Sequence, residues 1–150
     1  MDLFFTQRRY EETQLWRDHE PLRHEIEDAM AALARLVPND WVGPKPGAQR
    51  RPRHSIRLAL LWGDPISFWT AFRVGQALHR LHNVIPDQLS ARLLDHREFD
   101  GAAHELEVGG MLAAGRLDFD WHPIGGDLRL RSGARHYVEM KARHPLSERQ

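Results

Sequence analysis

Cysteine is absent from the 150 residues of the chain. The chain therefore has no disulfide bridge and no thiolate ligand for a metal, and this composition suits a reducing compartment. Charge of one sign is also lacking, because Lys and Arg together number 21 and so do Asp and Glu. Net charge favours neither a polyanionic nor a polycationic partner, so any contact with nucleic acid must come from a local basic patch.

Signals for export, membrane insertion and nucleotide binding are missing as well. Residues 1–10 lack an apolar stretch followed by a small-residue cleavage site. No apolar run approaches the ~20 residues of a membrane helix. The motifs GxxxxGK[ST], GxGxxG and GxSxG, which mark P-loop, Rossmann and α/β-hydrolase proteins, do not occur. We expect a cytoplasmic protein without a membrane partner.

The first 95 residues are predicted to be mostly helical. Residues 4–19 are polar with scattered aromatics, and Pro21 suits the first turn of a new helix. The next apolar residues follow at helical spacing: Leu22, Ile26, Met30, Leu33 and Val37. This stripe predicts an amphipathic helix that ends at residues 38–40.

Two further helices are predicted after residue 62. Asp64-Pro65 is a typical helix start, and the helix should run to His82, where Asn83 ends it. Its apolar residues are Ile66, Trp69, Phe72, Leu78 and Leu81. The aromatics of residues 62–72 have helical spacing and indicate core, not a platform for bases. Residues 86–95 predict another short helix, whereas the apolar residues 55–62 fit either a strand or a helix.

An irregular basic loop is predicted at residues 42–54, because proline and glycine interrupt regular structure there. The loop contains the densest basic run of the chain: Lys45, Arg50, Arg51 and Arg53. Such a loop could bind phosphates of a nucleic acid. The alternative is a solvated linker without a binding role.

Histidine is abundant, with 10 residues, so a zinc site has to be considered. His79 and His82 are three residues apart on one predicted helix, and His19 and His24 lie on either side of Pro21. Zinc needs three or four ligands in a recognisable pattern, and no HExxH motif occurs. Solvated or hydrogen-bonded histidines are the simpler interpretation.

A β-hairpin is predicted within residues 125–142. Residues 127–131 and 137–141 alternate polar and apolar, and Ser132-Gly133-Ala134 lies between them as a turn. One face should carry all the apolar side chains: Leu128, Leu130, Val138 and Met140. Facing residues of an antiparallel pair share a side, so the connection should hold an odd number of residues or contain a bulge.

The polar face of this hairpin is a candidate magnesium site. Asp127 would lie across from Glu139 and Lys141. Mg²⁺ prefers hard oxygen ligands and is usually held by one or two carboxylates. A nearby lysine can steady a hydroxide or neutralise phosphoryl charge. The alternative is a solvated face with an ordinary cross-strand ion pair.

These elements resemble the PD-(D/E)xK nuclease superfamily, whose fold is restriction-endonuclease-like. Its core opens with a glutamate-bearing helix and continues with three strands, an Asp starting the second and (D/E)-x-K on the third. Here residues 99–115 resemble the helix and residues 117–123 the first strand, with Asp127 and Glu139-Met140-Lys141 as the motif. Gly126 stands where a proline often precedes the Asp.

The resemblance implies a mixed α/β (α+β) fold class. A helical region, residues 1–95, would precede an incomplete α-β-β-β core, residues 96–150, that is truncated after its third strand. It also implies a magnesium-dependent nuclease, acting on DNA, with Mn²⁺ as a substitute ion. Asp127 and Glu139 would hold the metal and Lys141 would orient the attacking water.

On the helix, Glu105 is the expected site residue, binding the water shell of the metal or a second ion. Glu107 lies on another face, and the alternative is that both glutamates are surface residues. For the chain as a whole, the other interpretation is a non-catalytic helical interaction protein or an inactive nuclease remnant, because later elements of the nuclease fold are missing.

Overall fold

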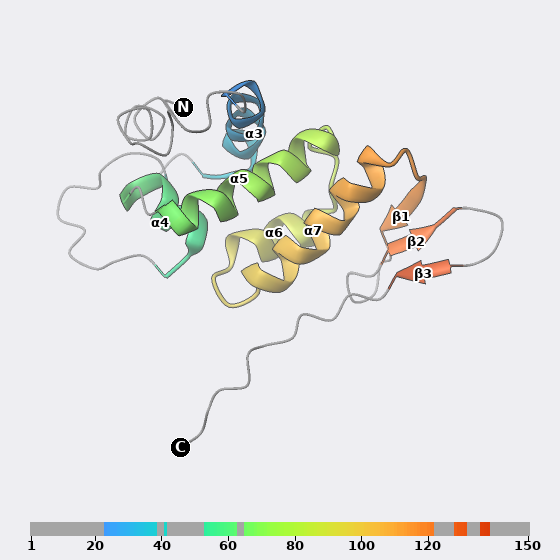
Figure 1. Ribbon diagram of the computed structural model, residues 1–150. Helices are drawn as coiled ribbons and strands as arrows, with labels where there is room; N and C mark the ends of the chain where they lie inside the picture. Colours follow the sequence, from blue (N-terminus) through green and yellow to red (C-terminus); the bar gives the residue numbers. More distant parts are fainter. Residues whose placement is uncertain are drawn as a thin grey trace, which may run out of the picture.

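The computed structural model describes residues 23–38, 41, 53–62, 65–121, 128–131 and 136–138. This part of the chain is mostly helical and carries one small antiparallel sheet, so the fold class is mixed α+β (Figure 1). The helix predicted at residues 4–19 and most of the basic loop lie outside the described residues.

Helix α3, Arg23–Leu36, is the amphipathic helix that the apolar spacing predicts. Ile26, Met30 and Leu33 are buried on one face, and Val37 after the helix is buried too. Burial of a large aliphatic side chain is worth about 1.5–3 kcal/mol. The predicted stripe therefore fixes which face of α3 meets the rest of the protein.

Helix α5, Pro65–Arg80, lies at the centre of the helical part, with α3 on one side and helix α7, Phe99–Ala114, on the other (Figure 1). Small residues permit close approach at both crossings. A Cβ at Gly75 would overlap the backbone carbonyl of Ala29 on α3. A Cβ at Gly110 on α7 would lie 2.9 Å from the Cα and Cβ of Ala77. The backbones are in contact at these points, so substitution requires the helices to separate.

Helix α5, predicted to run to His82, ends two residues earlier, at Arg80. His82 and Asn83 follow with φ of 52° and 59°, so Asn83 lies in the turn that ends the helix. Asparagine tolerates this left-handed conformation better than most residues. The Asn83 backbone N–H donates a hydrogen bond to the Leu78 carbonyl oxygen. The Asn83 side-chain Nδ2 donates another to the carbonyl oxygen of Ala32 at 2.9 Å. One residue thus ends α5 and ties it to α3.

Residues 55–62, which fit either strand or helix by sequence, form helix α4, Ser55–Trp62. Helix α6, Asp87–Leu94, confirms the short helix predicted at residues 86–95. A single cluster of buried apolar residues includes members from every helix from α3 to α7. The helix of the predicted C-terminal region, α7, is thus packed into the same core as the helices before residue 95.

One predicted core residue of α5 is exposed. Phe68, Phe72, Leu78 and Leu81 are buried, whereas the Ile66 side chain is 81% exposed. Ile66 lies in the first turn of α5, where residue type alone does not decide orientation. The aromatics Phe68, Trp69 and Phe72 contact one another edge to face, which confirms that this stretch contributes to the core.

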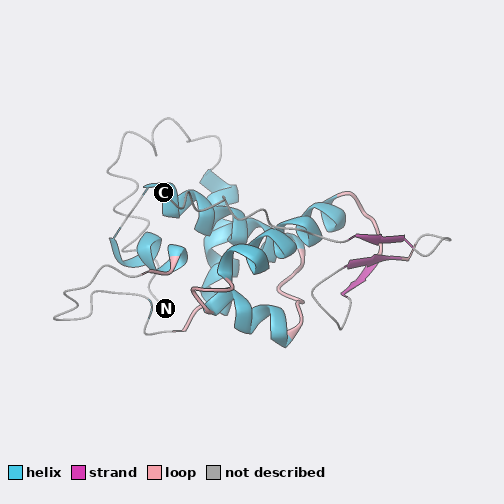
Figure 2. Ribbon diagram, turned by 90° about the horizontal axis from the view of Figure 1, so that it is seen from below, coloured by secondary structure: helices cyan, strands magenta, loops and turns pink. Residues whose placement is uncertain are grey.

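The sheet consists of three short strands in the order β1-β2-β3: Phe119–Trp121, Leu128–Leu130 and His136–Val138. Both pairs are antiparallel. Figures 1 and 2 show the sheet at one end of the helical part, beside the C-terminal half of α7. Trp121 packs there on Gly109, where a Cβ would lie 2.5 Å from the indole ring.

Candidate functional site

The predicted hairpin register is confirmed within the described strands. Leu128 pairs with Val138, Leu130 with His136, and five residues connect β2 to β3. This is the odd connection that the apolar pattern requires. Leu128 is completely buried, and Leu130 and Val138 are half-buried, so the apolar face turns toward the protein.

The opposite face of the sheet is polar. Arg129 and Arg131 are exposed, and Asp120 on β1, which lies opposite Arg129, forms a diagonal ion pair with Arg131. The Arg131 guanidinium, which donates hydrogen bonds to the carboxylate, lowers the pKa of Asp120. This contact is a cross-strand ion pair of the kind that the solvated-face alternative describes, although its residues are not those of the predicted site.

Asp127, Glu139 and Lys141 lie outside the described residues. Their convergence on one face of the hairpin stays a prediction. The described pairing ends one residue short of Asp127 on β2 and one residue short of Glu139 on β3.

Glu105 on α7 is buried, with its side chain only 7% exposed. Its Oε2 accepts a hydrogen bond from Arg92 Nη1 at 2.7 Å. Arg92 comes from α6, and its Nε lies 3.4 Å from a carboxylate oxygen of Glu98. The alternative in which both glutamates are surface residues is therefore wrong for Glu105. Its carboxylate is held through Oε2 by a guanidinium that balances its charge.

Gly101, Glu105 and Gly109 repeat every four residues along one face of α7. Arg92 lies over Gly101, where a Cβ would be 3.7 Å from its Nη2, and Trp121 lies over Gly109. Glu105 therefore sits between the contact with α6 and the contact with the sheet.

Glu107 contacts a different helix. Its Oε1 accepts a hydrogen bond from Arg73 Nε at 3.0 Å, and Arg73 Nη2 lies 2.9 Å from the same oxygen. The Glu107 side chain is 23% exposed and the Arg73 side chain 61%, so the pair lies at the surface where α5 meets α7. Pairs this exposed contribute about 0–1 kcal/mol.

Of the four basic residues predicted to bind phosphates, the structure describes Arg53, which is exposed. Lys45, Arg50 and Arg51 lie outside the described residues. Arg53 borders a cavity of about 280 Å³ between the start of α4 and the end of α6. The other residues that line it include Trp41, His54, Arg57, Asp95 and His96.

His54 is a buried histidine whose two ring nitrogens are both engaged. Nδ1 accepts the Ile56 backbone N–H at 3.2 Å, and Nε2 lies 2.9 Å from the Leu93 carbonyl oxygen. A carbonyl only accepts, so Nε2 carries the proton and the ring is neutral. Burial lowers the pKa of His54, partly opposed by the Leu93 hydrogen bond. The ring also contacts Trp41 and Phe99, each at 4.6 Å between centroids.

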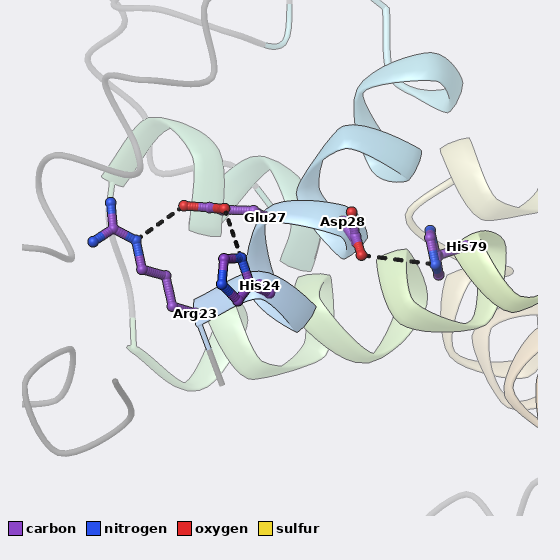
Figure 3. A network of polar contacts seen from close by, with 5 residues as sticks. All are labelled: Arg23, His24, Glu27, Asp28 and His79. Atoms are coloured by element: carbon purple, nitrogen blue, oxygen red, sulfur yellow. Dashed lines mark hydrogen bonds and ion pairs between the residues drawn. The ribbon is translucent and has the colours of Figure 1, made fainter. Parts of the chain in front are cut away.

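Two of the four histidines considered for zinc, His24 on α3 and His79 on α5, contact carboxylates of α3, whereas His19 lies outside the described residues. His24 lies 3.6 Å from Glu27, and His79 on α5 lies 3.9 Å from Asp28 (Figure 3). His82 is exposed. Within the described ranges, no three histidine, aspartate or glutamate side chains gather closely enough to hold a metal ion. His24 and His79 each pair with a single carboxylate.

Sequence reasoning missed Arg57, Arg92 and the engagement of His54. Arg92 meets Glu105 across 13 residues, and His54 meets Leu93 across 39. Neither pairing follows a helical or strand period, so no local pattern could have predicted it.

Comparisons of the chain with protein-family models, curated proteins and solved structures gave no match. Among the described residues, no helix has the length and apolar content to cross a membrane.

Proposed function

We propose that the chain is a magnesium-dependent nuclease of the PD-(D/E)xK type that acts on DNA. The observation that carries the proposal is the element order α7-β1-β2-β3 together with the pairing of Leu128 with Val138. One further residue of the same pairing would bring Asp127 opposite Glu139, on the polar face.

The donor set suits a hard cation. Two carboxylates opposite each other offer the oxygen ligands that Mg²⁺ prefers, with Mn²⁺ as a substitute, and leave room for the waters that Mg²⁺ retains. Asp127 and Glu139 would hold the ion, helped by the carbonyl of Met140. When bound, the ion would supply charge neutralisation at the phosphodiester and an acidified water.

The remaining roles fall to side chains of the chain itself. Lys141 is two residues beyond Glu139, so strand alternation would put both on one face. Its ammonium would orient the attacking water and balance charge on the phosphate. Asp120 is already neutralised by Arg131 and would not compete for the cation.

Glu105 stays a prediction as a site residue. Its carboxylate reaches Arg92 in the structure, and α7 packs on the side of Trp121 and the apolar face. The proposal therefore rests first on Asp127, Glu139 and Lys141. Glu105 would join them at the water shell or at a second ion.

Binding of DNA would use local basic residues, because the chain has no net charge. The proposed contacts are Lys45, Arg50, Arg51 and Arg53. Affinity should then fall steeply with salt, since each neutralised phosphate releases counterions.

A cleavage and melting experiment tests the proposal. Wild-type protein should nick supercoiled plasmid in millimolar Mg²⁺ and not in chelator. Asp127→Asn should abolish cleavage, whereas Asp118→Asn, at an exposed carboxylate just before β1, should cleave as the wild type does.

The melting temperatures of the same proteins report on the metal. Mg²⁺ binds the folded site and not the unfolded chain, so it should raise the wild-type melting temperature. Asp127→Asn should be at least as stable as wild type in chelator, because repulsion with Glu139 is removed, and should lose the Mg²⁺ effect. The proposal would be refuted if Mg²⁺ does not change the melting temperature of the wild-type protein and no cleavage occurs.

A non-catalytic interaction protein is the second candidate. The Asp120–Arg131 pair favours it, since it shows that the polar face of the described sheet holds a plain ion pair. In that case Asp127 would pair with a cation, and Asp127→Asn would slightly destabilise the protein in chelator. Calorimetric titration with Mg²⁺ would then show no binding heat.

A further inference from the structure

The cavity between α4 and α6 has the composition of an anion site. It holds about 280 Å³, the volume of roughly nine water molecules at ~30 Å³ each. Two guanidinium groups, Arg53 and Arg57, and the imidazole of His96 border it, against the single carboxylate of Asp95. Its size admits a phosphate together with a sugar or part of a base.

Arg57 is held in a fixed position beside the cavity. Its Nε is buried, and none of the described residues accepts a hydrogen bond from it. Because a buried atom is out of reach of a ligand in the cavity, such a ligand would bond the Nη groups of the guanidinium. The same guanidinium lies 5.7 Å above the ring of Trp41, so it is held in place by an aromatic face.

The other polar groups of the cavity are already engaged and would not compete. Both ring nitrogens of His54 are hydrogen-bonded, so the ring is neutral and forms part of the cavity wall. Asp95 Oδ1 accepts the Arg97 backbone N–H at 2.7 Å and lies 3.9 Å from His96 Nδ1. The donors left to meet a ligand are therefore the guanidinium groups and the ring of His96, whose Nδ1 lies beyond hydrogen-bond distance of Asp95.

We infer that this cavity binds the phosphate group of a nucleotide. The guanidinium fork matches the geometry of phosphate oxygens and can donate two parallel hydrogen bonds. Trp41 supplies a flat apolar wall next to the phosphate, suited to a base or sugar. The site uses none of the hairpin residues that would hold the cation, but it shares Arg53 with the DNA contacts proposed above. The phosphate can come from a free mononucleotide or from a strand.

Calorimetry in the presence of chelator tests the inference with four ligands: inorganic phosphate, 5′-AMP, adenosine and an octathymidylate. We expect 5′-AMP to bind at least about 10-fold more tightly than adenosine, because charged hydrogen bonds supply the difference. A higher affinity for 5′-AMP than for the octamer identifies a free nucleotide as the source, and the reverse identifies a strand.

Variants locate the binding. The affinities are compared for whichever of 5′-AMP and the octamer binds wild type more tightly. Arg57→Met keeps the aliphatic stem of the side chain and should lower this affinity at least about 10-fold. Arg53→Met, at an exposed position that tolerates substitution, should lower it about 3- to 10-fold by the same reasoning. Arg35→Met removes an exposed charge that does not border the cavity and should change nothing. A thermal melt of each variant checks folding.

One more variant distinguishes nucleotide binding in the cavity from metal binding at the hairpin. Asp127→Asn should bind 5′-AMP as the wild type does, whatever its effect on cleavage. The inference is overturned if neither 5′-AMP nor the octamer binds, if adenosine binds as tightly as 5′-AMP, or if folded Arg53→Met and Arg57→Met both retain wild-type affinity.

Discussion

The ion pair between Arg92 and Glu105 predicts an asymmetric loss of stability. The Glu105 side chain is 7% exposed and the Arg92 side chain 32%. Removing the guanidinium takes the Arg92 hydrogen bond from the more deeply buried charge. Breaking a buried pair in this way costs about 3–5 kcal/mol, and the partial exposure of Arg92 puts the Arg92→Met variant near 3 kcal/mol. At about 2–4 °C per kcal/mol, its melting temperature should fall by ~6–12 °C.

Glu105→Gln should cost less, because the amide oxygen can still accept a hydrogen bond from Arg92. The loss is the difference between a charged and a neutral bond, about 1–2 kcal/mol. Glu98→Gln is the matched control: it meets the same arginine at 3.4 Å, but its side chain is 57% exposed, so about 0–1 kcal/mol is expected.

Thermal and urea unfolding at neutral pH measure these differences. The double variant Arg92→Met/Glu105→Gln should be more stable than Arg92→Met alone, because the buried carboxylate is gone. Acidification should also narrow the gap between Arg92→Met and wild type, since a protonated carboxyl no longer needs a cation. The reasoning fails if Glu98→Gln and Glu105→Gln cost the same, or if the double variant is no more stable than Arg92→Met.

Two further predictions concern packing and pH. Gly75→Ala should destabilise the protein by about 1–3 kcal/mol, because the new methyl group overlaps the Ala29 carbonyl. Gly101→Ala, whose new methyl group has its nearest atom at 3.7 Å, should stabilise the protein by about 0.5–1 kcal/mol. Equal urea midpoints for the two variants would contradict this prediction. The pKa of His54 is lowered from 6.5, so the unfolded chain takes up the proton first and stability should fall as pH drops below 6.5. His54→Gln should show a smaller loss between pH 7.5 and pH 5, and an equal loss would show that His54 does not contribute.

The helices and the register of the hairpin could be predicted from the sequence, because both are determined by residues close together in the chain. The apolar stripe from Ile26 to Val37 predicted α3, and Asn83 predicted the end of α5 to within two residues. Alternation in the hairpin predicted that Leu128 and Val138 share a face, and their observed pairing agrees, since a slip by one residue would expose one apolar set.

What the sequence left open has non-local causes. Residues 55–62 are too short and too uniformly apolar for periodicity to separate helix from strand. Ile66 is apolar yet exposed, whereas Ser67 and Phe68 in the same turn are buried, so the first turn of α5 packs on a side that Ile66 does not face. The burial of Glu105 was not predicted, because its partner Arg92 belongs to another helix. Of the candidate site, the hairpin register was predictable, whereas the neutralisation of Glu105 was not.

The central claim is that the hairpin residues hold a catalytic cation and that Lys141 acts on the water beside it. The most direct measurement is plasmid cleavage by Lys141→Ala in millimolar Mg²⁺, with its melting temperature recorded with and without the ion. The account predicts that cleavage falls by about 100-fold or more while the Mg²⁺-induced rise in melting temperature persists, because the carboxylates remain. Cleavage at the wild-type rate by Lys141→Ala would contradict the account.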